Sequence, residues 1–301
     1  MKSKTGVGGW MAIVTVGLLT QAMVMEAQTQ VGWSPADRIE SVNAWYDASA
    51  AATITVSGNN VTSWNDKSGN NYHLTVTEDG SQPSNDGDEL NGHATIEFGE
   101  ADGYIATEGT LPSAFYGDVS VYMVLKSDRS AYGGSTVDNP LSATTLNDSW
   151  AIMTVNEFRV PAAKIAMLLP AGTGDIDFTG INGLGVPADP LDDSGPTMNR
   201  LPDAFAVLSF VFDSPDVSVS NPARLTMGKR YADRGTGAHC SIAEVIIVSG
   251  KDSEADRQKM EGYLAWKWRL GDNLVADHPY TAAKGGRDVF FPPSPSVIRF
   301  R

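Results

Sequence analysis

Pairs of carboxylates are the first feature of this sequence that bears on chemistry. Hydrolysis of a glycosidic bond uses two carboxyl groups placed on either side of that bond. Asp175 and Asp177 have the two-residue spacing that puts side chains on one face of a strand, but no glutamate accompanies them. Glu97 and Glu100 are three residues apart, across the expected end of a strand. Neither pair suits the reaction, so we expect a chain that is not an enzyme; a polysaccharide-degrading hydrolase or lyase is the alternative.

Other catalytic motifs are missing from the sequence. It contains no Gly-x-Ser-x-Gly elbow, no phosphate-binding loop and no dinucleotide-binding glycine pattern. The single cysteine, Cys240, cannot form a disulfide within the chain, and it precedes an apolar run. We therefore expect a small buried side chain there, not a nucleophile.

Three aspartates suggest a calcium site. Asp66 begins the turn-like run Asp66-Lys67-Ser68-Gly69-Asn70, and its carboxylate can join Asp47 or Asp102 as an oxygen ligand of Ca²⁺. The simpler interpretation is that Asp66 caps a turn. The four histidines show no metal-binding spacing.

A second group of residues has the side-chain types found in sugar sites. Such sites combine aromatic, amide and acidic side chains near loop tips. Residues of these types in the central part of the chain are the candidate ligand-binding set: Tyr132, Asn147, Asp148 and Trp150. Trp45 and Trp64 lie within apolar patterns, so we expect them in the core; a stacking platform for sugar rings is the alternative.

The elements that must position these residues are short strands. Candidate strands cover 93–98, 119–126, 150–155, 164–169, 204–212, 223–228 and 242–248. The run 119–126 is apolar on both faces, which indicates a strand covered on both sides. Turn pairs such as Asn91-Gly92, Asp102-Gly103 and Asn182-Gly183 separate the runs, and 30 glycines and 16 prolines supply further turns. Many short strands with frequent turns predict an all-β sandwich.

One helix is predicted near the end of the chain. Ser253 with Asp256 has the spacing of a capping box, and an apolar stripe follows through Met260, Leu264 and Trp268. Lys267 interrupts this stripe, so we expect either that its amino group reaches solvent or that the residue lies at the edge of the stripe. Gly271 is the expected end of the helix. The stretch 171–202 shows no periodicity and is predicted to be a long loop.

The two ends of the chain differ from the domain between them. Residues 1–30 begin with two lysines and continue with an uncharged apolar run, the order found in a secretory signal peptide. A retained anchor or an assembly arm is the alternative. We expect one domain over 31–284, and an extended tail over 285–301, where three prolines oppose strand formation.

Composition limits the partners. The 301 residues carry 22 Lys and Arg against 36 Asp and Glu, a formal net charge of −14. A surface of this sign repels nucleic acid, so no nucleic-acid partner is expected.

Two stretches carry a family resemblance. The first includes Trp45-Tyr46-Asp47 and Trp64-Asn65-Asp66, with 90–98 following; the second includes 243–247, 257–268 and His278-Pro279-Tyr280. Together they resemble the concanavalin A-like lectin/glucanase superfamily, in particular the laminin-G-like jelly-roll modules of bacterial secreted proteins and of phage virion or tail proteins. The resemblance runs from about residue 33 to 280, and 128–203 departs from it.

This resemblance implies a jelly-roll sandwich and leaves several functions open. We expect a non-catalytic, lectin-like module that binds a glycan or a cell-surface polysaccharide outside the cytoplasm. The alternative is a virion structural protein, such as a capsid decoration or tail-fibre subunit, that contacts other virion proteins. A homo-oligomer is compatible with either. The glucanases of the superfamily carry Glu-x-Asp-x-(x)-Glu on one strand, and this sequence lacks that motif.

Overall fold

The computed structural model describes residues 32–76, 82–85, 89–99, 103–109, 111–115, 117–127, 136–144, 150–156, 164–168, 176–186, 204–214, 224–229 and 238–292. The predictions for 1–30 and for the end of the proline-rich tail fall on residues outside these ranges. Within the described residues, no helix is both long enough and apolar enough to span a membrane.

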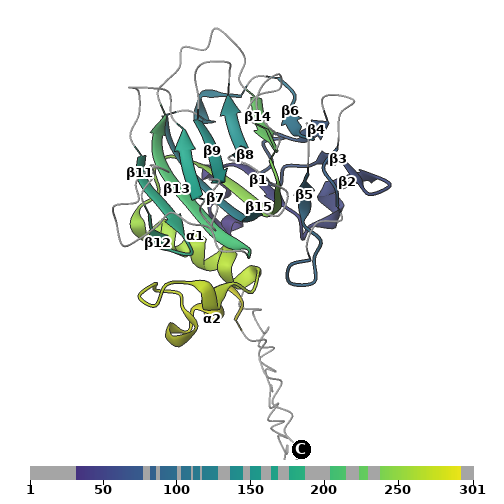
Figure 1. Ribbon diagram of the computed structural model, residues 1–301. Helices are drawn as coiled ribbons and strands as arrows, with labels where there is room; N and C mark the ends of the chain where they lie inside the picture. The colour runs from purple at the N-terminus through teal and green to yellow at the C-terminus, as the bar shows by residue number, and fades with distance from the viewer. Residues whose placement is uncertain are drawn as a thin grey trace, which may run out of the picture. The chain divides into compact units, whose positions relative to one another are not determined.

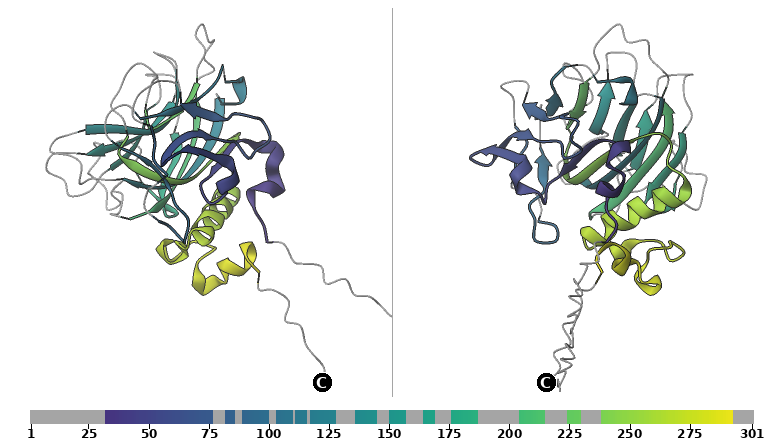
Figure 2. Two further views of the ribbon diagram at one scale, coloured as in Figure 1. Left: turned by 90° about the vertical axis from the view of Figure 1, so that its right-hand side faces the viewer. Right: turned by 180° about the vertical axis from the view of Figure 1, so that it is seen from behind.

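Two antiparallel sheets form the body of the protein (Figures 1 and 2). The first has the order β1 (Val42–Asp47), β15 (Cys240–Ser249), β7 (Gly117–Ser127), β13 (Ala206–Ser214), β11 (Ile176–Ile181) and β12 (Leu184–Gly185), with β5 (Ile96–Phe98) also paired to β15. The second has the order β10 (Lys164–Leu168), β9 (Trp150–Asn156), β8 (Thr136–Thr144), β14 (Arg224–Met227), β6 (Ile105–Thr107), β4 (Leu74–Val76), β3 (Asn60–Trp64) and β2 (Ile54–Ser57). The predicted all-β sandwich is confirmed.

The centre of the first sheet is buried on both faces. Val119, Val121 and Met123 of β7 alternate with Ser120 and Tyr122, and all five are buried. The Tyr122 hydroxyl donates to Asp252, which lies just before the helix α1. The even-numbered side chains of β7 therefore point toward the face of the sheet on which this helix lies. The predicted two-sided burial of this strand is confirmed.

Helices close the side of this sheet away from the sandwich interior. The helix α1 (Glu254–Lys267) contacts β13 and β7, and Figures 1 and 2 show it across one end of the sheet. Ser253 caps it, because its hydroxyl accepts from the backbone amide of Asp256. The short α2 (Gly286–Phe290) packs on α1, so extended chain does not begin at residue 285 as predicted. The 3₁₀ turns η1 (Pro35–Ser41), η2 (Ala51–Thr53), η3 (Ser113–Phe115), η4 (Gly271–Asn273) and η5 (Ala282–Lys284) complete the described elements.

Two further predictions about elements were wrong. The stretch 171–202 is not wholly a loop, since β11 and β12 form a hairpin within it. Its turn is Asn182-Gly183, with φ of 52° and 82°, the pair expected for a tight hairpin turn. The helix α1 ends before Gly271: Trp268 is its C-cap and Arg269 adopts φ of 56°.

The core between the sheets is the main source of stability, and Leu208 of β13 tests this. Its side chain is fully buried, so Leu208→Ala leaves a cavity and is expected to lower the free energy of unfolding by about 2–5 kcal/mol. Urea denaturation measures the change. The matched control is Leu184→Ala at a position that is 40 % exposed, where the loss is expected to stay below about 0.5 kcal/mol. Equal losses in both variants would contradict this assignment of the core.

Candidate functional site

A cluster of four charged side chains joins the end of α1 to the first sheet. We call Asp47, Lys67, Glu244 and Lys267 the buried charge cluster. Asp47 and Glu244 face each other in the register of β1 and β15. The Lys267 amino nitrogen lies 2.7 Å from Asp47 Oδ2 and 2.7 Å from Glu244 Oε2, and the Lys67 amino nitrogen lies 2.5 Å from Asp47 Oδ2.

Two indoles complete the surroundings of Glu244. Trp45 Nε1 donates to Glu244 Oε1 at 2.7 Å, and Trp268 Nε1 donates to Oε2 at 2.5 Å. The Lys67 ammonium lies 4.0 Å from the centre of the Trp45 ring, a favourable cation–π contact. Both carboxylates are thus paired with cations or N–H donors, which a buried charge requires.

The environments of the two carboxylates move their pKa values in opposite directions. Burial raises the pKa of Glu244; Lys267 opposes this and Asp47 adds to it, and the net shift is upward. Burial also favours a higher pKa for Asp47, but Lys267 and Lys67 outweigh it and lower this pKa to about 2. Carboxylates with diverging pKa values are a pattern of acid–base catalysis. Here, however, Glu244 is fully buried and Asp47 is 3 % exposed, so these two carboxylates stabilise the fold.

Asp66 organises the neighbouring turn. Its carboxylate accepts from the backbone amides of Trp45, Ser68 and Tyr72 and from the Ser68 hydroxyl, at 2.7–3.2 Å. These contacts make Asp66 the cap of its turn, as the simpler interpretation held. Asp47 is committed to the two lysines and to Ser49.

The described residues do not form a set of ligands for the calcium ion suggested by the sequence. In those ranges, no three His, Cys, Asp or Glu side chains are grouped as a metal ion would require. Asp102 lies outside the described residues, so a calcium site formed by Asp47, Asp66 and Asp102 stays a prediction.

A second buried polar group links the middle of α1 to β13 of the same sheet. Glu261 accepts from the Ser209 hydroxyl at 2.5 Å, forms an ion pair with Arg257 at 2.7 Å and lies 3.2 Å from His278. The Arg257 guanidinium stacks 3.6 Å from the centre of the Phe178 ring. Since Glu261 is fully buried, these contacts fix α1 and the His278 segment to the sheet.

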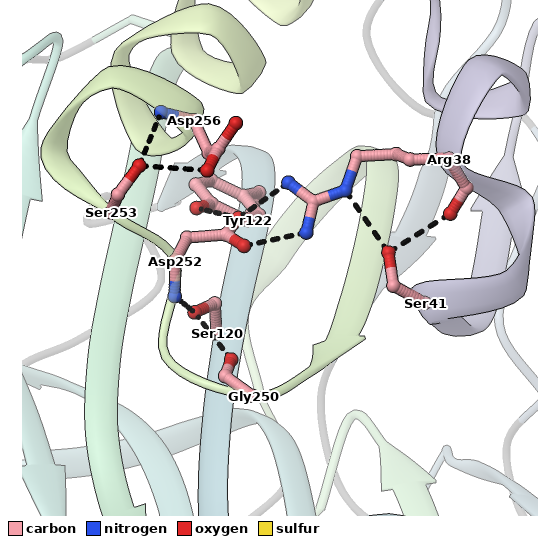
Figure 3. A network of polar contacts seen from close by, with 8 residues as sticks. All are labelled: Arg38, Ser41, Ser120, Tyr122, Gly250, Asp252, Ser253 and Asp256. Atoms are coloured by element: carbon pink, nitrogen blue, oxygen red, sulfur yellow. Dashed lines mark hydrogen bonds and ion pairs between the residues drawn. The ribbon is translucent and has the colours of Figure 1, made fainter.

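A third network ties η1 to the start of α1 (Figure 3). The Arg38 guanidinium makes two hydrogen bonds to Asp252, at 2.6 and 3.1 Å. The Tyr122 hydroxyl donates to the Asp252 carboxylate, and the Asp252 backbone amide donates to the Ser120 hydroxyl. Asp252 therefore joins β7, η1 and the start of α1.

An open pocket of about 450 Å³ lies at the C-terminal end of α1. We call it the C-terminal pocket. Its lining residues are Asn91, Trp266, Lys267, Arg269, Gly271, Asp272, Arg287 and Phe291.

Backbone contacts fix the shape of this pocket. Trp266 Nε1 donates to the Tyr280 carbonyl at 2.7 Å, which orients the indole. A Cβ at Gly271 would lie 2.8 Å from three atoms of the Trp266 ring, so glycine is needed for this approach. Asn91 Nδ2 donates to the Lys267 carbonyl at 2.6 Å and joins the Asn91-Gly92 turn to the helix end. The walls are thus held by hydrogen bonds before any ligand binds.

The described part of the structure does not test whether the ligand-binding residues predicted from the sequence lie close together. Tyr132, Asn147 and Asp148 lie outside them, and Trp150 begins β9 with its side chain undescribed. Of the candidate acids, Asp177 is exposed on β11 and pairs with Lys251 at 2.8 Å, while Asp175 and Glu100 lie outside the described residues. Glu97 is on β5. Trp45, Trp64 and Cys240 are buried, as predicted.

Sequence reasoning missed the residues of the C-terminal pocket and misread Lys267. Its amino group does not reach solvent: it is buried between two carboxylates. Two signals pointed that way, a lysine within an apolar helical stripe and Glu244 within the apolar run 242–248. Buried opposite charges commonly pair, but nothing in the sequence alone says that these two do.

No family model and no curated protein sequence matches the chain. Among solved structures, it is similar to a mutant of a GH54 α-L-arabinofuranosidase soaked with 4-nitrophenyl α-L-arabinofuranoside, with a TM-score of 0.40 and 16 % identity over 67 % of this chain and 50 % of that one. It is also similar to a Trypanosoma rangeli sialidase in complex with sialic acid, with a TM-score of 0.36 and 9 % identity over 74 % of this chain and 33 % of that one. The chain thus spans about half the length of the first and a third of the second.

These matches correct one expectation. The prediction that the chain is not an enzyme is contradicted, because the matched structures are arabinofuranosidases and sialidases, which are enzymes. We withdraw it. At 9–16 % identity and TM-scores of 0.40 or less, the matches assign no activity to this chain.

The first test of the buried charge cluster removes its shared cation. Lys267→Met leaves two buried carboxylates without their common partner, and the free energy of unfolding is expected to fall by about 3–5 kcal/mol. The matched control is Lys251→Met, because Lys251 also contacts two carboxylates, at 2.8 and 3.5 Å, but on the surface. Its loss is expected to stay below about 1 kcal/mol. Similar losses by chemical denaturation would refute a special role for Lys267.

The second test uses pH. The pKa of Asp47 is lowered from 3.8 to about 2, so its stabilisation is complete above about pH 4 and lost as pH falls through 2. Glu244 acts in the opposite sense: its raised pKa favours the folded state at low pH, and this contribution is lost as pH rises above 4.5. The stability difference between the wild type and Asp47→Asn is expected to shrink by about 2 kcal/mol between pH 4 and 2. Parallel stability curves would contradict the shift; Asp277→Asn, at an exposed position, is the control.

Proposed function

We propose that this chain binds carbohydrate in the C-terminal pocket, on a fold of the concanavalin A-like type. The observation that carries the proposal is the set of side chains around the open space. An indole, an amide, two guanidinium groups and a carboxylate line one pocket, contributed by Trp266, Asn91, Arg269, Arg287 and Asp272.

This set matches the two surfaces of a sugar. The C–H face of a pyranose ring is apolar and packs on an aromatic ring, while its hydroxyl groups need both donors and acceptors. Trp266 supplies the aromatic ring, Arg269 and Arg287 supply donors, and Asp272 supplies acceptors. A volume of about 450 Å³ is within the range of small-ligand sites and suits one or two sugar units.

The orientation of the indole also supports binding. The Trp266 N–H is already used by the Tyr280 carbonyl, and the ring rests against Gly271. A ring fixed in this way loses little conformational freedom when a ligand stacks on it. The arabinofuranosidases and sialidases that the chain resembles also act on carbohydrate, but the proposal rests on the pocket. Export and a virion role stay predictions.

A comparison of two aspartates tests the proposal. Asp272 lines the pocket and Asp277 does not, although both are exposed and five residues apart. Asp272→Asn is expected to weaken binding of a sugar by about tenfold or more, because one charged acceptor of hydroxyl groups is lost. Asp277→Asn is expected to bind as the wild type does. A glycan array selects the sugar and calorimetry measures the affinity.

The same samples report on catalysis. Release of reducing ends from the bound glycan reads out hydrolysis, and its loss in Asp272→Asn with retention in Asp277→Asn would extend the proposal from binding to cleavage. If no glycan binds, or if both variants bind equally well, the C-terminal pocket is not a carbohydrate site.

A further inference from the structure

We infer that the sugar bound in the C-terminal pocket carries a negatively charged group, a carboxylate or a sulfate ester, held by Arg269 and Arg287. This inference rests on the proposed function and narrows its ligand to anionic carbohydrate. It is carried by the charge of the pocket and by the backbone conformation of Arg269.

The pocket is positive although the protein is acidic. The ammonium of Lys267 is already neutralised by Asp47 and Glu244, so the lining charges left for a ligand are two guanidinium groups and the Asp272 carboxylate. The balance is one positive charge, on a chain whose formal net charge is −14. A local positive site on such a chain selects an anionic group at short range, because the rest of the surface repels it.

Both guanidinium groups are available to a ligand. Arg269 is exposed, and within the described residues its side chain makes no ion pair or hydrogen bond. Arg287 pairs with the Asp288 carboxylate at 3.9 Å, and both side chains are more than 60 % exposed, so this pair is weak. Guanidinium groups bind carboxylate and sulfate oxygens through paired N–H donors, which lysine cannot do.

The backbone at Arg269 gives an independent indication. The amide of Arg269 donates to the Trp266 carbonyl and that of Leu270 donates to the Ala265 carbonyl, the two bonds of a Schellman motif. Arg269 is the left-handed residue of this motif, with φ of 56°, where glycine is usual. An arginine at this position costs stability relative to glycine, and such strain is concentrated at functional sites. We attribute the arginine at this strained position to the function of its guanidinium group in the pocket.

The key variant is Arg269→Gly, which removes the guanidinium and relieves the strained backbone. The melting temperature is expected to rise by about 2 °C, so loss of binding cannot be ascribed to unfolding. Arg287→Ala removes the second guanidinium from an exposed position. Arg224→Gln, exposed on β14 and outside the pocket, controls for the loss of one positive charge.

The probes are a matched panel of neutral, uronate-containing and sulfated oligosaccharides of the same length, measured by calorimetry. The wild type and Arg224→Gln are expected to bind a charged member at least tenfold more tightly than its neutral counterpart. Arg269→Gly and Arg287→Ala are each expected to lose most of this preference. The member that binds best, uronate or sulfate ester, identifies the source of the charge.

Two results would overturn the inference, and they differ in what else they overturn. Equal binding of neutral and charged sugars, or an unchanged preference in both arginine variants, would refute the anionic ligand and leave carbohydrate binding standing. Absence of binding by every member of the panel would overturn the anionic ligand together with the proposed function.

Discussion

One ammonium group between two carboxylates holds the end of α1 against the first sheet. Lys267 pairs with Asp47 on β1 and Glu244 on β15, both out of reach of water. Removing a buried charge from its partners is costly, so the end of α1 has one position relative to the sheet in which all three groups are paired. Trp45 and Trp268 complete this arrangement by donating to Glu244. The cluster therefore fixes the position of the helix end on the sheet, in addition to its electrostatic contribution to stability.

The geometry of the C-terminal pocket depends on this fixed position of the helix end. Trp266 precedes Lys267 by one residue and Arg269 follows it by two, so fixing the lysine inward places these neighbours at the helix end that faces outward. The carbonyl of Lys267 also accepts a hydrogen bond from the Asn91 side-chain amide. This bond holds the turn before β5 against the end of the helix. Lys267, whose ammonium is paired inward with two carboxylates, thus positions several other residues that line the pocket. This division between a buried support and an exposed lining is what a preorganised site requires.

Seven strands in the described part of the chain were predictable because their apolar runs are bounded by turns; β1 to β4, β6, β8, β11 and β12 were not among the predicted runs. All seven runs proposed from the sequence contain a strand, and the N-cap Ser253 was found from local spacing. The helix end was not, because Arg269 occupies a left-handed position that sequence rules assign to glycine, and Gly271 instead makes room for Trp266. The inward direction of Lys267 could not be read locally, since its partners are set by the pairing of β1 with β15. Long-range pairing decides such a site, and local periodicity does not report it.

The pairing of the first and last strands of the first sheet also has a consequence for the order of folding. Trp45 and Glu244 are 199 residues apart in sequence, and Arg38 and Asp252 are 214 apart, yet each pair is in direct contact. A nascent chain therefore emerges with β1 unpaired until β15 has been synthesised, and contacts over such separations slow the search for the native state. During that interval, the apolar face of β1 and its free edge are open to other chains, which is the condition under which large β-proteins aggregate. Asp47, at the end of β1, places a negative charge there that opposes apolar association before Lys267 has been synthesised and pairs with it.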